Sequence, residues 1–144
     1  MFAEYNYDSF PIINVKLNNV QDDDDFDNFL QEWLNLYIKQ EDFTFIFDTT
    51  NVSQVPIKYS IRMADFIRNL KNDNSYHYLQ KSIIIVNSSF VKHMLSLIFK
   101  LQSPIAPVYI LESEYREYIT SLLNNEEILN ITCIMPGKSF IPFL

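Results

Sequence analysis

The stretch SIIIVNSSFVKHMLSLIFKL, residues 82–101, decides the fold class of this 144-residue chain. It opens with a short, mostly β-branched apolar run, Ser82–Val86, which is typical of a strand buried on both faces. Asn87, Ser88 and Ser89 can cap a helix, and the apolar residues that follow recur at spacings of three and four, as on the buried side of a helix. A buried strand followed at once by an amphipathic helix is a building block of α/β folds.

Two further apolar runs extend this pattern in both directions along the chain. Phe43–Phe47 and Val108–Leu111 match strands buried on both faces. Each is followed by a helical pattern, the first with Pro56 in its opening turn and the second opening at Glu112 or Ser113. Because parallel strands need crossover connections, we expect a central parallel sheet with helices on both faces.

The two ends of the chain predict strands of a different kind. Residues 10–17 alternate from Ile13 onward between apolar and polar side chains, which indicates a strand with one solvated face, expected at an edge of the sheet. Residues 131–134 are expected to form a last edge strand, and residues 136–144 either a poorly ordered tail or a docked apolar strap. The predicted fold is therefore α/β, a single domain over residues 1–144 with a mostly parallel sheet, mixed at its edges and flanked by helices.

The one long acidic run, Asp22–Asp25, precedes a helical pattern that extends to Ile38. Carboxylates favour the positive end of a helix dipole, so the run is interpreted as a helix start. A calcium loop is the alternative, but such loops space their ligands and include a Gly. On this helix Trp33 is expected to be buried.

Composition narrows the possible partners and the compartment. The formal charge of −7 argues against nucleic acid or an anionic membrane surface as partner, since both require clustered Lys and Arg. The single cysteine, Cys133, cannot form an internal disulfide, which favours the cytoplasm. We expect neither a signal peptide nor a transmembrane segment, because no basic and apolar leader and no run of about 20 apolar residues is present.

Residues typical of catalysis or cofactor binding are scarce. The chain has 1 Gly, so it lacks the Gly-rich loop that holds nucleotide phosphates. His77 and His93 lie outside any zinc motif, and Cys133 falls in an apolar run where a thiol is expected to be inert core. We therefore expect no cofactor, no metal and no catalytic residues.

The loop DTTNVSQ, residues 48–54, is the candidate interaction site. Loops at the carboxyl ends of parallel strands line the crevice where α/β sheets bind their partners. The residues of interest are Asp48, Thr49, Thr50 and Ser53. As exposed turn groups, the three hydroxyls should each contribute no more than about 0.5 kcal/mol to stability, so that their removal would affect binding more. The alternative is that these residues only make turns and cap the next helix.

The order of Phe45–Asp48, Met63–Ile67 and Lys81–Val86, followed at once by a helix, resembles the STAS (SpoIIAA-like) fold over about residues 10–124. Residues Tyr78–Lys81 and Phe90–Phe99 are similar to CRAL-TRIO domains, which bind lipids. Bacterial STAS members carry an Asp-Ser-(Ser/Thr)-Gly phosphorylation element at the start of the second helix. The matching stretch here, residues 53–60, has neither Asp nor Gly, and Ser53 and Ser60 are its two serines.

Three functions follow from these observations. The first is a non-enzymatic protein-interaction or regulatory module with a STAS-like fold, whose partner is another protein or a second copy of the chain in a homodimer. The alternative is a small apolar-ligand or lipid-binding carrier of CRAL-TRIO-like type, and a third is an enzyme with a site built from Asp48, Thr49 and Thr50. An enclosed cavity of about 300–1,000 Å³ would favour the carrier, and a solid core the interaction module.

Overall fold

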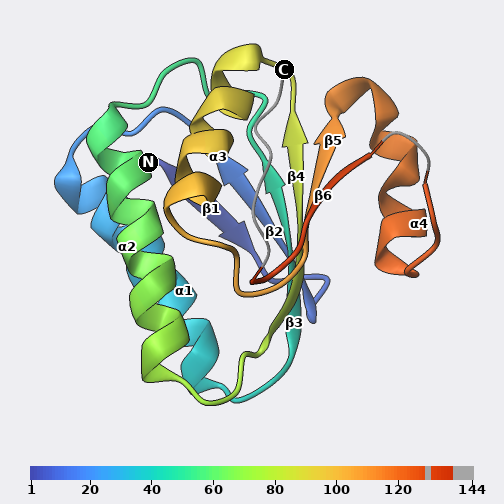
Figure 1. Cartoon of the computed structure of the whole chain (residues 1–144), viewed down its shortest axis with the longest axis horizontal. Coiled ribbons are helices and arrows are strands. Elements are labelled where there is room, and N and C mark those ends of the chain that lie inside the picture. Colours follow the sequence, from blue (N-terminus) through green and yellow to red (C-terminus); the bar gives the residue numbers. More distant parts are fainter. Residues whose placement is uncertain (129–130, 138–144) are drawn as a thin grey trace.

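The computed structural model describes residues 1–128 and 131–137. Within these residues, six strands form one sheet in the order β1-β2-β3-β4-β5-β6 (Figure 1). The strands are β1 (Ala3–Asn6), β2 (Ile12–Leu17), β3 (Phe43–Asp48), β4 (Leu79–Val86), β5 (Val108–Glu112) and β6 (Thr132–Ile134). The helices are α1 (Asp23–Ile38), α2 (Ile57–Asp73), α3 (Ser89–Leu101), a 3₁₀ helix (Ser113–Tyr118) and α4 (Ile119–Leu123). The α/β fold class is as the sequence predicts.

The four central strands, β2 to β5, are parallel neighbours. Ser82 of β4 lies opposite Phe45 of β3 on one side and Val108 of β5 on the other. The prediction that the three apolar runs form a parallel sheet is therefore confirmed.

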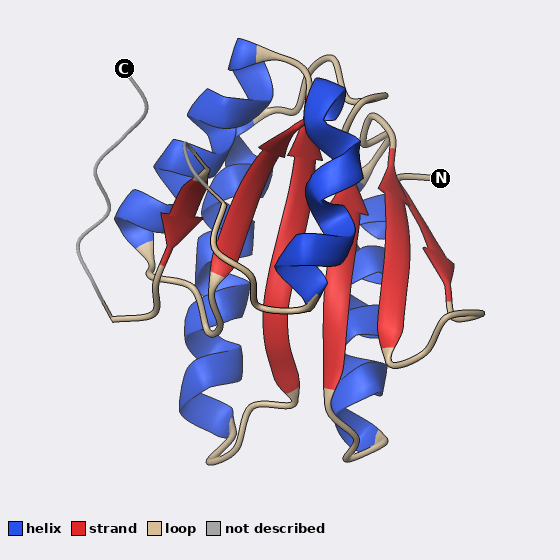
Figure 2. Ribbon diagram, turned by 90° about the vertical axis from the view of Figure 1, so that its right-hand side faces the viewer, coloured by secondary structure: helices blue, strands red, loops and turns tan. Residues whose placement is uncertain are grey.

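The helices cover the two faces of the sheet very unequally. α1, α2 and α3 lie together on one face, while the 3₁₀ helix and α4 lie on the other (Figure 1, Figure 2). The sequential strand order explains this arrangement, because crossovers of one hand that always add the next strand on the same side place their helices on the same face. Helices on both faces were expected, but three helices on one face were not.

The outermost strands, β1 and β6, are both antiparallel to their neighbours. β6 corresponds to the predicted last strand. The prediction that residues 10–17 form an edge strand is wrong, because this segment is β2 and pairs with β1 as well as with β3. In β1, Ala3 is buried and Glu4 and Asn6 are exposed, an alternation too short to be noticed in the sequence.

Side-chain caps begin two of the helices where the sequence predicts. The Asp22 carboxylate accepts a hydrogen bond from the Asp25 amide at 2.8 Å, and Asp25 in turn accepts one from the Phe2 amide at 2.6 Å. The acidic run is thus a helix start that also holds the amino-terminal segment. The Ser88 hydroxyl accepts from the Val91 amide at 3.2 Å and caps α3 in the same way.

The segment after β5 differs from its prediction. A continuous helix was expected to open at residue 112 or 113, but Tyr115 departs from helical geometry, with φ −109° and ψ 27°. A 3₁₀ helix therefore precedes the short α4. Lys81 of β4 ties this segment to the sheet, because its ammonium donates to the Leu122 carbonyl at 2.8 Å and to the Asn125 side chain. Desolvation by burial lowers the pKa of Lys81.

Two hydrophobic clusters occupy the two faces of the sheet. The larger lies between the sheet and α1–α3, and its centre is aromatic: the Phe45 ring centroid is 4.9 Å from that of Trp33 and 4.6 Å from that of Phe47. Trp33 is 5% exposed, which confirms its predicted burial. The smaller cluster consists of Ile46, Ile83, Ile85, Leu111 and Leu122.

None of the described helices is long and apolar enough to cross a bilayer. Beyond Gly137, the carboxyl-terminal segment for which a tail or strap was expected lies outside the described residues.

Candidate functional site

The predicted interaction loop begins with a closed turn at the end of β3. Asp48 Oδ1 accepts hydrogen bonds from the Thr50 amide at 2.9 Å and from the Thr50 hydroxyl at 2.6 Å. Asp48 Oδ2 lies 3.1 Å from the Arg116 guanidinium, which comes from the 3₁₀ helix. Burial raises the pKa of Asp48, but the hydrogen bonds from Thr50 and the Arg116 charge outweigh this and hold the pKa below its ordinary value. The carboxylate is thus already engaged by the protein.

Thr49 is a structural residue of this loop. It is 2% exposed, and its hydroxyl donates to the Ile85 carbonyl of β4 at 2.7 Å. The Thr49 amide donates to the same carbonyl at 3.0 Å. The expectation that Thr49 is an exposed turn group is therefore wrong, because the end of β3 packs so closely against β4 that the hydroxyl extends their pairing.

We expect Thr49→Val, which keeps the side-chain shape and removes the hydroxyl, to lower the free energy of unfolding by about 1–2 kcal/mol. Thr50→Val should cost less, because the Thr50 hydroxyl is only partly buried and Asp48 keeps the Thr50 amide as a donor. Urea denaturation of the two variants makes this comparison. A Thr49 effect no larger than that of Thr50 would show that the buried hydrogen bond is unimportant.

Ser53 joins the loop to the end of β2 through Asn19. The Asn19 side chain donates to the Ser53 hydroxyl at 2.9 Å and accepts from the Ser53 amide, also at 2.9 Å. Asn87, after β4, donates to the Thr50 carbonyl at 3.3 Å. Asp48, Thr49, Thr50 and Ser53 thus lie together at the carboxyl edge of the sheet, as expected, but in a network of turn and cap contacts. The sequence analysis did not predict that Asn19, Asn87 and Arg116 contact this loop. The two asparagines could have been noticed, because each closely follows a strand and so lies at the same edge of the sheet.

The remaining polar candidates do not form a catalytic constellation with this loop. His77 Nδ1 is 3.1 Å from the Tyr37 hydroxyl, ahead of β4, and His93 is exposed on α3. Desolvation by burial lowers the pKa of His77. Across residues 1–128 and 131–137, no three His, Cys, Asp or Glu side chains gather in a group able to hold a metal ion.

Cys133 is not a core residue, contrary to the prediction. It is exposed on the edge strand β6, with its sulfur 3.6 Å from that of Met135. The apolar run around it misled because an edge strand buries only alternate side chains, here Ile134. Partial desolvation nevertheless raises the pKa of the Cys133 thiol, which disfavours the reactive thiolate.

An apolar cavity lies between the sheet and the layer formed by α1, α2 and α3. Its volume is about 110 Å³. Aromatic side chains contribute much of its wall, and Met63 of α2 and Met94 of α3 are among the half-buried residues that line it. Ser60 also lines it and is 3% exposed, which leaves Ser53 as the accessible serine of the stretch 53–60. The core is therefore not solid, but the volume is below the 300–1,000 Å³ expected of a carrier of larger ligands.

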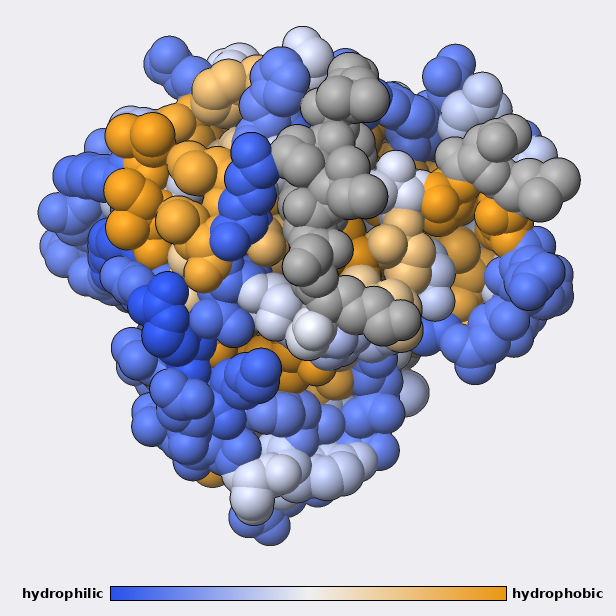
Figure 3. All heavy atoms as spheres, viewed as in Figure 1, coloured by the Kyte–Doolittle hydropathy of each residue, from blue (hydrophilic) through white to orange (hydrophobic). Residues whose placement is uncertain are grey.

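Large apolar side chains are exposed on the outer side of α2 and α3. We call this set the α2–α3 surface: Ile57 (67% exposed), Ile61 (46%), Phe90 (39%) and Leu101 (46%). Orange, hydrophobic spheres gather over these two helices in the space-filling view (Figure 3). Since α2 follows the loop 48–54, the α2–α3 surface continues from the predicted interaction loop.

Comparison with known proteins adds no identification. Neither a scan against protein-family models nor a search of curated proteins finds a match to this chain. The STAS and CRAL-TRIO resemblances therefore remain predictions from the sequence pattern.

Proposed function

We propose that this chain is a non-enzymatic protein-interaction module that docks a partner protein on the α2–α3 surface and the adjoining loop 48–54. The observation that carries the proposal is the exposure of four large apolar side chains on two neighbouring helices. Contiguous apolar surface rimmed by polar residues marks interaction sites on folded proteins. The regulatory role and cytoplasmic location implied by the sequence belong to the same proposal.

The spacing of apolar residues on α2 and α3 gives each helix an outward-facing apolar side in addition to the side that packs on the core. Ile57 and Ile61 are four residues apart, so they lie on one side of α2. On α3, Phe90, Leu97 and Leu101 form an outer stripe, whereas Val91, Leu95 and Ile98 face the core. Full burial of an exposed isoleucine against a partner contributes about 1.5–3 kcal/mol, so a few such contacts support a stable complex.

Charged residues border the α2–α3 surface, but they form ion pairs beside it and do not cover its apolar side chains. Lys58 pairs with Asp23 at 3.1 Å, and Arg62 pairs with Asp27, so both cations are tied to α1. This leaves a polar margin on one side of the apolar side chains, as at the rim of a protein interface. The STAS-like resemblance is compatible with the proposal, because β3 ends in Asp48 and is followed by a loop, α2, β4 and α3 in the order that it implies.

We expect Ile57→Glu to reduce partner binding at least tenfold, whereas Ile38→Glu should leave it unchanged. Ile38 is a matched control, because it is 76% exposed and lies at the far end of α1. Both substitutions should change stability by no more than about 0.5 kcal/mol. Sedimentation velocity tests self-association first, and capture from the native cell with each variant tests other protein partners.

Photo-crosslinking locates the contact. A photoreactive phenylalanine analogue at Phe90 should yield a covalent adduct with the partner, and the same analogue at Tyr76, also exposed, should not. Equal partner recovery by the Ile57 and Ile38 variants, together with adducts at neither position, would refute docking on this surface.

A further inference from the structure

Trp33 contains a buried polar group, the N–H of the indole ring. Its indole N–H has no hydrogen-bond partner among the described residues, although the side chain is 5% exposed. A buried unsatisfied donor costs about 1–3 kcal/mol, so it is seldom left in a core without a reason. The chain has 1 Trp, and a phenylalanine at this position would avoid the cost.

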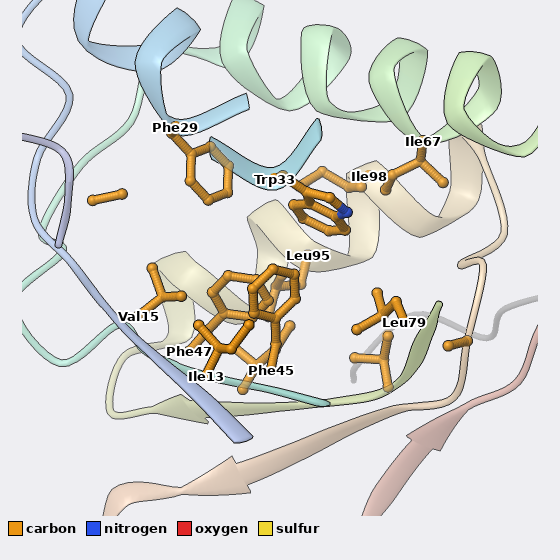
Figure 4. Packing of buried hydrophobic residues seen from close by; sticks show 14 of the residues in the cluster. Ile13, Val15, Phe29, Trp33, Phe45, Phe47, Ile67, Leu79, Leu95 and Ile98 are labelled. Carbon is orange, nitrogen blue, oxygen red and sulfur yellow. The ribbon is translucent and has the colours of Figure 1, made fainter. Parts of the chain in front are cut away.

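The indole ring of Trp33 lines the cavity described above, and its buried nitrogen lies within the cavity wall, without surface open to the cavity itself. The Trp33 nitrogen points toward the space between Ile67 and Ile98 on the helical side and Leu79 on the sheet (Figure 4). All four residues belong to the lining. The donor and the cavity therefore form one arrangement: an apolar wall that contains a buried donor without a partner among the described residues.

We infer that this cavity is a binding site for a compact, largely apolar molecule with one hydrogen-bond acceptor, which accepts the Trp33 N–H. The ligand class is a small ketone, ester or ether. This site is separate from the proposed docking of a protein, which takes place on the outer side of α2 and α3.

The volume sets the size of the ligand. An apolar cavity of roughly 150 Å³ holds benzene or xenon, so about 110 Å³ suits a molecule of roughly five or six non-hydrogen atoms. A lipid tail is too long for this space. Met63 and Met94 line the cavity from the neighbouring helices α2 and α3, and their unbranched side chains can adjust to the shape of the ligand.

Water fits the site poorly. An ordered buried water usually makes two to four hydrogen bonds, but the wall around the open volume is apolar. The Thr49 hydroxyl in the lining already donates to the Ile85 carbonyl. The Trp33 nitrogen is itself buried, so the ligand reaches it after a small shift of a lining side chain.

The test compares two ligands of nearly the same shape, cyclopentanone and methylenecyclopentane, of which only the ketone is a strong acceptor. Because the chain has 1 Trp, its indole N–H gives one cross-peak in a proton–nitrogen NMR spectrum. We expect cyclopentanone to move this peak downfield, as a new hydrogen bond does, and methylenecyclopentane to leave it nearly in place.

Trp33→Phe separates the hydrogen bond from the apolar contact. The ketone should bind this variant about fivefold to tenfold more weakly than the wild type, the value of one neutral hydrogen bond. The affinity for the alkene should change less than twofold. Methionine methyl resonances report binding of both ligands to both proteins. Ala106→Leu, which adds a side chain to the lining, should weaken both ligands at least fivefold.

Two results would overturn the inference. Binding of both ligands without preference, with an unmoved indole peak, would leave a nonspecific apolar void. Absence of binding by either ligand up to its solubility limit would show that the cavity is not a ligand site. Both measurements use the folded wild-type chain, so neither depends on whether Ala106→Leu folds.

Discussion

Trp33→Ala should lower the free energy of unfolding by about 3–5 kcal/mol, the range for truncating a large buried aromatic residue. The indole ring packs against Phe45 and Phe66, with centroids 4.9 and 5.3 Å away, and it joins α1 to both the sheet and α2. Its loss would also enlarge a cavity that the wild-type core already contains. Chemical denaturation followed by circular dichroism measures the effect in a variant that has lost its tryptophan.

Trp33→Phe is the matched control for this prediction. It keeps an aromatic ring in the cluster and removes an N–H that has no partner among the described residues. The lost packing and the relieved desolvation oppose each other, so the net change should stay within about 1.5 kcal/mol. A Trp33→Ala effect as small as that of Trp33→Phe would mean that the ring is not a central packing element.

Phe45→Ala should be similarly severe, at about 3–5 kcal/mol. Phe45 is fully buried in β3, and its ring contacts those of Tyr5, Trp33, Phe43 and Phe47. It thus connects the sheet with the aromatic side chains of α1. A denaturant midpoint measured together with the slope of the transition distinguishes lost stability from a change in the denatured state.

Ile46, the next residue, tests whether the two faces of the sheet contribute unequally. It belongs to the smaller cluster, under α4. Ile46→Val should cost about 0.5–1.5 kcal/mol, the ordinary cost of one buried methyl group. Phe45→Val also introduces valine, but on the face covered by α1, α2 and α3, and it should cost more. Equal costs would contradict a larger contribution of that face to stability.

The strands could be predicted because each carries its own signal. Runs such as Phe43–Phe47 are apolar on both faces, and this property depends only on burial in a parallel sheet. The strand order and the unequal distribution of helices depend on which strands pair with each other. This pairing cannot be predicted from the sequence of any one strand. β1 was missed for a local reason, since one buried and one half-buried side chain in four residues are too few to form a recognisable pattern.

The candidate site was predictable in position but not in role. That Asp48 and Ser53 lie at the carboxyl edge follows from parallel topology. The burial of Thr49 and the contacts of Ser53 with Asn19 depend on how closely neighbouring loops approach, which the sequence does not state. The cavity could not be predicted from the sequence, because its size depends on the distance between the helices and the sheet. The missing partner of the Trp33 N–H likewise depends on the positions of all the neighbouring residues.

Every strand of this sheet pairs with the strand that precedes or follows it in the chain. No pairing must therefore wait for a distant segment to arrive, and the entropic cost of loop closure stays close to that of a single crossover. Folding rates rise as contacts become more local, so this topology favours rapid assembly for a sheet that is largely parallel. Folding of the sheet can start at any strand–helix–strand unit and proceed toward either edge, where β1 and β6 are the last strands to pair.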